Sequence, residues 1–186
     1  MKDSQIVDLY WQRDETAISE TETKYGRFCF SIANNILHDD EDAKECVNDT
    51  YLGAWNAMPP HRPEMLSTFL GKITRRLSLK KWRDRSADKR GGGSVALSME
   101  ELEECIPSRQ RTDDSIAVAE LTDLINGFLE SLPVEERRVF LRRYWYFDSI
   151  SDISARFGFG ESKVKMMLKR TRDKLLVRLQ KEDAAV

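Results

Sequence analysis

One segment of the chain combines residue types that suit contact with DNA: residues 152–172, DISARFGFGESKVKMMLKRTR. It has a short run of regularly spaced apolar residues, then two glycines two positions apart, then a run dense in Lys and Arg. Lys can donate to guanine edges or to phosphates, Ser can donate to either, and Arg suits phosphates. The segment therefore predicts a helix that contacts DNA; the alternative is an amphipathic helix whose basic face is only solvated.

The elements that would position these donors are two helices with a tight turn between them. The apolar positions of the two helices are Ile150, Ile153, Phe157, Val164, Leu168, Leu175 and Leu179. Gly158 stands where a helix commonly ends in a left-handed residue, and Gly160 stands at the cap of the next helix. Ser149 and Asp152 resemble a capping box. Packing of one apolar stripe on the other gives the geometry of a helix-turn-helix.

In a helix-turn-helix, the N-terminal end of the second helix enters the major groove. The residues that we expect to face the groove are Ser162, Lys163, Lys165 and Met166. The residues that we expect to face the DNA backbone are Lys169, Arg170 and Arg172.

The composition is that of a folded protein with segregated charge. The 186 residues are 40% hydrophobic, 33% charged and 9% aromatic, which suits one domain or two small ones. The net charge of −2 identifies no partner. Acidic residues gather in residues 37–50, whereas Lys and Arg gather in residues 71–85 and 161–178. Separate acidic and basic blocks indicate separate partners for separate faces.

The residue types that usually carry catalysis or bind metals are sparse. His38 and His61 are the only histidines, and neither belongs to a triad or a metal motif. Cys29, Cys46 and Cys105 fit neither a zinc pattern nor a disulfide framework, and the first two fall on apolar helix stripes, which predicts packing. We therefore expect no catalytic residue, no metal and no cofactor. Without a signal-peptide core or a membrane-length apolar run, we expect a soluble cytoplasmic protein with no membrane insertion.

Almost the whole chain has the periodicity of amphipathic helices, and no hairpin signal occurs. Besides the helix pair, apolar stripes predict helices over residues 25–36, 43–55, 66–77, 121–132 and 133–145, the last starting at Pro133. Residues 86–115 contain three consecutive glycines and an acidic cluster, which predicts a flexible linker with a short helix in LSMEELEECI. We expect an all-α protein of two small helical domains joined by this linker.

Four motifs in this order point to a known family: DDEDAKECVNDTYLGAW, STFLGKITRRLSLKKWRDR, SLPVEERRVFLRRYW and the helix pair. The chain resembles a bacterial RNA polymerase sigma factor of the sigma-70 family, extracytoplasmic-function type, from about Glu20 to Leu179. The resemblance implies a region 2 domain over residues 1–88, a flexible linker over 89–116 and a region 4 domain over 117–186. It also implies a non-enzymatic role, in which core RNA polymerase carries out the chemistry of transcription.

The resemblance assigns a partner to each charged block. The residues implied to dock on the clamp coiled coil of the largest polymerase subunit are Asp42, Glu45, Asn48 and Asp49. The residues implied to contact the −10 promoter element are His61, Arg62, Arg75, Arg76, Lys80, Lys81, Trp82 and Arg83. The helix pair is implied to read the −35 element with the seven residues named above.

The loop MPPHRPEM matches the place where the family holds a base that has left the DNA stack. His61 and Arg62 could stack or donate there, and the alternative is a proline-rich surface loop. Trp82 either stacks on nucleic acid or closes the core, whereas Trp55 and Phe69 fall on apolar stripes and are expected in the core.

The sequence departs from the family pattern at two places. Arg76 stands where Asn is frequent, and Met166 and Met167 stand where Ser and Arg are common, so the contacts to both promoter elements should differ in detail. The acidic linker residues Glu100–Glu104 are implied to thread the polymerase channels, where negative charge imitates nucleic acid.

A stand-alone helix-turn-helix regulator is the alternative function. It would bind paired half-sites as a dimer without polymerase, whereas a sigma factor binds core polymerase tightly and DNA weakly by itself. An anti-sigma factor is a further partner that the resemblance allows, and the sequence does not name one.

Overall fold

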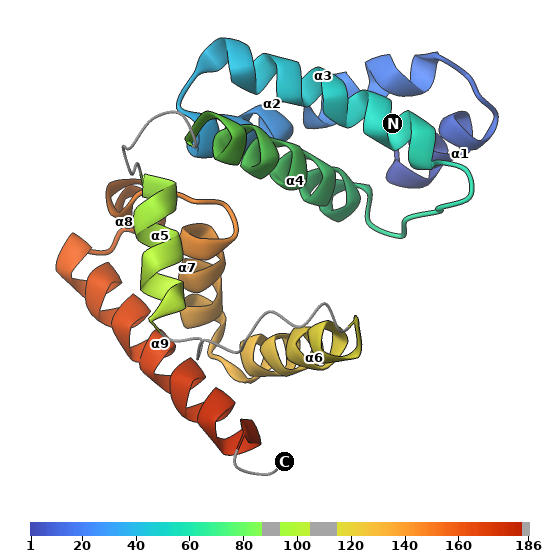
Figure 1. Ribbon diagram of the computed structural model, residues 1–186. Coiled ribbons are helices and arrows are strands. Elements are labelled where there is room, and N and C mark those ends of the chain that lie inside the picture. The colour runs from blue at the N-terminus through green and yellow to red at the C-terminus, as the bar shows by residue number, and fades with distance from the viewer. Residues whose placement is uncertain (87–93, 105–114, 184–186) are drawn as a thin grey trace. The chain divides into compact units, whose positions relative to one another are not determined.

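The computed structural model describes residues 1–86, 94–104 and 115–183 (Figure 1). Within those ranges every regular element is an α-helix, and the chain divides into two compact units, Met1–Gly91 and Gly92–Val186. The predicted all-α architecture of two small units is confirmed. No helix in the described part of the chain is long and apolar enough to cross a membrane.

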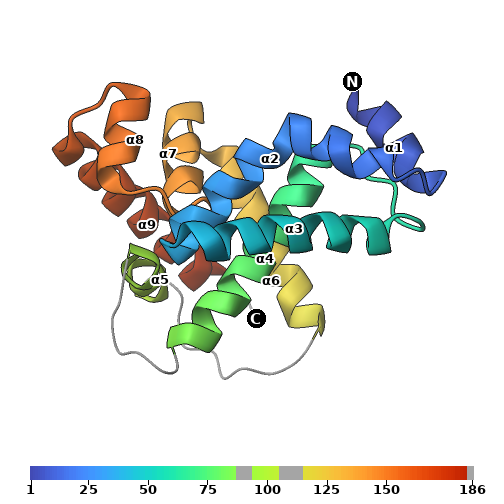
Figure 2. The same cartoon turned by 90° about the horizontal axis from the view of Figure 1, so that it is seen from above.

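The first unit contains α1 (Asp3–Trp11), α2 (Thr16–Leu37), α3 (Asp40–Ala57) and α4 (Leu66–Ser86). Helices α2, α3 and α4 lie side by side in both views and correspond to the three helices predicted for this part of the chain (Figures 1 and 2). Helix α2 ends at Leu37 and is capped by His38, whose φ of 51° is left-handed. The start of α3 is capped by Asp39, whose side chain accepts a 3.0 Å hydrogen bond from the amide of Asp42.

Helix α1 was not expected from the sequence. It packs on the start of α2 because Ile6, Val7 and Tyr10 are buried in the core of the unit. The Tyr10 hydroxyl is hydrogen-bonded to the Thr21 hydroxyl at 2.9 Å, so this buried polar group is satisfied. The spacing of these three residues is helical, but the helix is too short for the stripe to stand out against its polar surroundings.

The core of the first unit confirms the roles expected for several sequence positions. Cys29 and Cys46 are buried, and burial raises the pKa of both thiols, so they act as packing residues. Trp55 and Phe69 are partly buried and pack against the same core.

The second unit contains α5 (Ser94–Glu103), α6 (Ser115–Ser131), α7 (Val134–Tyr144), α8 (Ile150–Phe157) and α9 (Glu161–Asp183). Helix α5 is the short helix expected within the acidic segment, and it lies beside α7 (Figure 1). Pro133 is the residue before α7 rather than its first residue. The glycine run at 91–93 and Cys105 lie outside the described residues.

The helix-turn-helix prediction is confirmed in α8 and α9. Ser149 and Asp152 form the expected capping box, and Gly158 has the expected left-handed conformation, with a φ of 65°. Ile153 and Val164 are fully buried in one cluster, which holds the two helices together. These local signals fix where α9 begins and which of its faces is left exposed.

Candidate nucleic-acid and polymerase interfaces

The exposed side of α9 carries the side chains expected to read DNA. Its buried side is the stripe Val164, Leu168, Thr171 and Leu175. The exposed residues on the other side are Ser162, Lys163, Lys165, Met166, Lys169 and Arg170. The predicted groove-facing set therefore lies together on the first turns of the helix, on the surface that a major groove can reach.

Two of these cations already have neighbours inside the unit. The Lys163 ammonium lies 3.6 Å from the centre of the Phe159 ring, which stacks on Phe157 in the turn between the helices. The Lys165 ammonium is 3.8 Å from a Glu161 carboxylate oxygen, and both side chains are exposed. Each ammonium makes its contact at the end of a flexible side chain, so both can turn to a nucleic acid.

Arg172 has different surroundings from Lys169 and Arg170. Its side chain is only 17% exposed, and it donates a 2.6 Å hydrogen bond to the Tyr144 hydroxyl. Its guanidinium also lies 3.3 Å from a carboxylate oxygen of Glu101. The structure thus holds Arg172 against α5 and α7, and its contact with phosphate stays a prediction.

Glu101 on α5 is the centre of this network. Its carboxylate accepts hydrogen bonds of 2.9 Å from Arg143, which is 4% exposed, and of 2.8 Å from the Tyr144 hydroxyl. Burial alone would raise the pKa of Glu101, but the hydrogen bonds from Arg143 and Tyr144 outweigh burial and hold this pKa below its ordinary value. The acidic run itself does not distinguish Glu101 from its neighbours. The only sequence signal is that Val95, Ser98 and Leu102, which are buried or pack on the core, lie on the same side of α5.

The cations of α4 divide into two groups. Arg76, Lys80 and Arg83 are exposed and recur every three or four residues, so they share one face of the helix. Arg75 is partly buried, and burial lowers the pKa of its guanidinium. Lys81 turns toward α3 instead of joining the exposed face. Arg76, Lys80 and Arg83 therefore form an exposed cationic face, whose contact with phosphates stays a prediction, and Trp82 beside them is half-buried.

Two of the four expected polymerase-docking residues are paired with cations of α4. The Lys81 ammonium lies 2.9 Å from a carboxylate oxygen of Asp42 and 2.5 Å from one of Glu45, and Arg85 also pairs with Asp42. These ion pairs join α3 to α4. The acidic and basic blocks, separate in the sequence, are therefore partly neutralised where they meet.

The middle of α3 has a further exposed surface beyond these ion pairs. Asn48 and Asp49 are exposed, and Leu52, one turn further on, is 58% exposed. Leu52 thus adds one exposed apolar side chain beside the polar groups of Asn48 and Asp49. The position of Leu52, three residues after Asp49, places both on one face of α3.

The loop between α3 and α4 holds His61 and Arg62, both exposed. The His61 ring centre lies 6.5 Å from that of Phe69 at the start of α4. Arg62 pairs with Asp8 of α1, and its guanidinium carbon lies 5.4 Å from the centre of the Trp11 ring. The loop is thus tied to α1 as well as to the helices that it connects.

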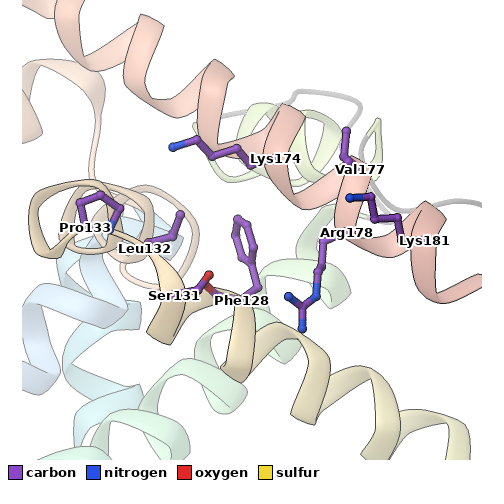
Figure 3. Close-up of a pocket in the computed structure, with 8 residues that line it drawn as sticks. All are labelled: Phe128, Ser131, Leu132, Pro133, Lys174, Val177, Arg178 and Lys181. Carbon is purple, nitrogen blue, oxygen red and sulfur yellow. The ribbon is translucent and has the colours of Figure 1, made fainter.

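An open pocket of about 520 Å³ lies between α6 and α9 (Figure 3). Its apolar lining includes Phe128, Leu132 and Val177, and its cations include Lys174 and Lys181. Such a lining suits an apolar side chain with acidic neighbours. Within the ranges that the structure describes, no group of three or more His, Cys, Asp or Glu side chains is placed to hold a metal ion.

Comparison with known families decides between the classes of function. Residues 23–87 match sigma-70 region 2, and residues 123–175 match sigma-70 region 4. The chain belongs to the sigma-70 family. The region 2 match covers most of α2 and all of α3 and α4, whereas α1 and α5 lie outside both matches. A search of the curated proteins found no match.

Membership in this family indicates what the chain binds. The sigma-70 regions support a role in promoter recognition, with core RNA polymerase and promoter DNA as partners. The face on α4 belongs to region 2, and the face on α9 belongs to region 4.

Proposed function

We propose that the protein is a cytoplasmic sigma factor of the extracytoplasmic-function type, which binds core RNA polymerase and directs it to promoters. The observation that carries this proposal is the pair of sigma-70 matches, each on a unit with an exposed cationic helix face. The polymerase supplies the bond-making chemistry, and this chain supplies recognition and DNA opening.

The −35 element is read by the first turns of α9. Lys163 and Lys165 can donate to guanine edges, Ser162 can donate to a base or a phosphate, and the exposed Met166 offers an apolar contact to a thymine methyl. Lys169 and Arg170, further along the exposed face, contact the DNA backbone in this proposal.

The −10 element is bound and opened by α4 and the loop before it. Arg76, Lys80 and Arg83 bind phosphates, which supplies affinity without sequence preference. Opening also needs a pocket for an unstacked base, because a base that leaves the duplex loses its stacking energy. His61 and Arg62 supply a ring and a planar cation for such a base, in the loop that α4 follows.

Core polymerase docks on the exposed side of α3. Asn48, Asp49 and Leu52 form an apolar and polar surface that the ion pairs with α4 leave open. We assign to this surface the contact with the clamp coiled coil of the largest subunit. Asp49 supplies negative charge on this surface, whereas Asp42 and Glu45 lie at its edge and reach the polymerase only by sharing their charge with Lys81 and Arg85.

The acidic segment around α5 acts inside the polymerase channels. Glu100, Glu103 and Glu104 are exposed, so they present negative charge where nucleic acid would otherwise lie. Replacement of Glu100, Glu103 and Glu104 with Gln, which keeps Glu101 on Arg143, should alter abortive synthesis, and an unchanged transcript profile would contradict this role.

The experiment that tests the proposed function measures two things: binding of the protein to core polymerase, and binding of the protein to DNA in the absence of polymerase. The purified protein should form a stoichiometric complex with core polymerase on gel filtration and should bind a random pool of DNA only weakly by itself. A stand-alone regulator would give the reverse: no complex with the polymerase, and selection of paired half-sites by a dimer.

A further inference from the structure

Helix α1 lies outside the region 2 match but contacts the loop that we assign to the −10 base. Its C-terminal residue, Trp11, donates a 3.2 Å hydrogen bond from the indole nitrogen to the carbonyl oxygen of His61, 50 residues away in the chain. One turn earlier, the Asp8 carboxylate pairs with the guanidinium of Arg62. Both residues of the loop that could meet a base are therefore held from α1.

The Trp11 side chain serves two of these contacts. While its nitrogen donates to His61, the face of its ring lies under the Arg62 guanidinium, with 5.4 Å from the guanidinium carbon to the ring centre. Arg62 is thus held between an aromatic face and a carboxylate, and its side chain is still 53% exposed. It can meet a base without first giving up its conformation.

The rest of α1 is fixed independently of the loop. Ile6, Val7 and Tyr10 are buried, and Asp3 pairs with Lys24 at 2.6 Å and accepts a 2.7 Å hydrogen bond from Tyr25. Helix α1 is therefore anchored on α2, and its far end can act as a rigid support for the loop.

We propose that Asp8 and Trp11 are positioning residues for −10 recognition, and that they set which unstacked base the loop accepts. This inference rests on the proposed function, because it assigns the loop to a base of the −10 element. Asp8 and Trp11 act through Arg62 and the backbone of His61, without touching DNA themselves.

The physical reason is that discrimination among four similar bases needs fixed donors. An arginine on a mobile loop satisfies any phosphate or base edge, whereas an arginine stacked on an indole keeps the plane of its donors constant. Asp8 also offsets the charge of Arg62, which weakens capture of phosphates relative to contact with a base edge. Loss of Asp8 or Trp11 should therefore reduce the preference for one base more than it reduces the overall affinity for DNA.

The test measures base preference with the reconstituted holoenzyme. The full-length protein with core polymerase is mixed with fork-junction DNA whose single-stranded −10 positions are randomised, and bound DNA is sequenced. The variants are Asp8→Asn, Trp11→Phe and Trp11→Leu. Trp11→Phe keeps a ring under Arg62 and removes the donor to His61, whereas Trp11→Leu removes both.

Asp3→Asn is the matched control, because it weakens the anchoring of α1 on α2 and on Leu66 of α4 without touching His61 or Arg62. We expect Asp8→Asn and Trp11→Leu to reduce the preference at one −10 position by roughly two- to fivefold, with Trp11→Phe in between. Preferences at the other positions, and the whole pattern for Asp3→Asn, should match those of the unmodified protein.

Three results would overturn the inference. The first is an unchanged preference in Asp8→Asn and Trp11→Leu, and the second is a uniform loss at all positions. The third is an equal effect of Asp3→Asn, which would assign α1 a purely structural role. If the unmodified holoenzyme selects no −10 sequence at all, the proposed function fails and this inference fails with it. Asp8→Asn changes an exposed pair, so the test does not depend on Trp11→Leu folding.

Discussion

Arg143 donates a 2.9 Å hydrogen bond to Glu101, which lies 42 residues earlier in the chain. The pair joins α7 to α5, so α5 is a packed part of the second unit. Arg143 is 4% exposed, and a guanidinium buried to this degree requires a charged partner. The contact explains why one glutamate of an otherwise exposed acidic run points into the protein.

The Glu101–Arg143 pair should stabilise the second unit. Glu101→Gln leaves Arg143 and Arg172 without their carboxylate, so the free energy of unfolding at neutral pH should fall by about 1–3 kcal/mol. Urea unfolding of the full chain measures the loss, and hydrogen exchange of the α7 and α9 amides assigns it to this unit. Glu103→Gln is the control, since Glu103 is exposed.

The same pair makes the stability of the folded protein depend on pH in a predictable direction. The folded protein lowers the pKa of Glu101 below the ordinary 4.5, so its contribution to stability is present above that value and is lost as the pH falls through the folded pKa. The stability difference between the unmodified protein and Glu101→Gln should therefore shrink below pH 4.5. A difference that stayed constant with pH would contradict the charged pair.

The exposed face of α4 should account for part of the salt dependence of DNA binding. Replacing Arg76, Lys80 or Arg83 with Ala should reduce the slope of log affinity against log salt by about 1 for each phosphate that the variant no longer binds. Arg85→Ala is the matched control, because Arg85 pairs with Asp42. Titration of promoter DNA with the holoenzyme at several salt concentrations gives the slopes. If the Arg76, Lys80 and Arg83 variants all kept the slope of the unmodified protein, this face would not bind phosphates.

Lys163 and Lys165 should distinguish one −35 sequence from another. Alanine at a position that reads a base should cost about 1–3 kcal/mol of binding to the preferred sequence and much less on others. Lys174→Ala is the control further along α9, where the ammonium pairs with Glu136 at 2.7 Å. Competition between matched and altered −35 elements measures the difference. An equal loss on every sequence would assign these lysines to phosphate.

The surface around Leu52 should determine affinity for core polymerase. Leu52→Ala removes an exposed apolar side chain and should weaken core binding by about 1–2 kcal/mol without lowering the stability of the free protein. Val134→Ala serves as the control, because Val134 is a similarly exposed apolar side chain on α7 of the second unit. Binding to surface-immobilised core polymerase measures the affinities of the variant and the control. If Leu52→Ala bound as tightly as the unmodified protein, this surface would not be the docking site.

The predictable parts of the structure are those set by local sequence. The turn of the helix-turn-helix depends on Gly158 and on the cap at Ser149, and both signals act within a few residues. The exposed face of α9 followed from the same periodicity that places Val164 in the core. For the same reason the helices of the first unit could be placed, apart from α1.

The contacts that sequence reasoning missed are long-range. Lys81 and Arg76 look alike in the sequence, and only the packing of α4 on α3 turns Lys81 toward Asp42 and leaves Arg76 exposed. Glu101 and Trp11 likewise acquire their partners from segments far along the chain. Such partners depend on tertiary packing, for which a single sequence carries no local signal.

Run-off transcription is the measurement that tests the central claim most directly. Core RNA polymerase is supplied with a promoter selected from random DNA by the holoenzyme, with and without the purified protein. The proposed function predicts a transcript of fixed length that appears only when the protein is added and is lost when the −10 element is altered. A protein that fails to bind core polymerase, or binds it without giving any protein-dependent transcript, would contradict the claim.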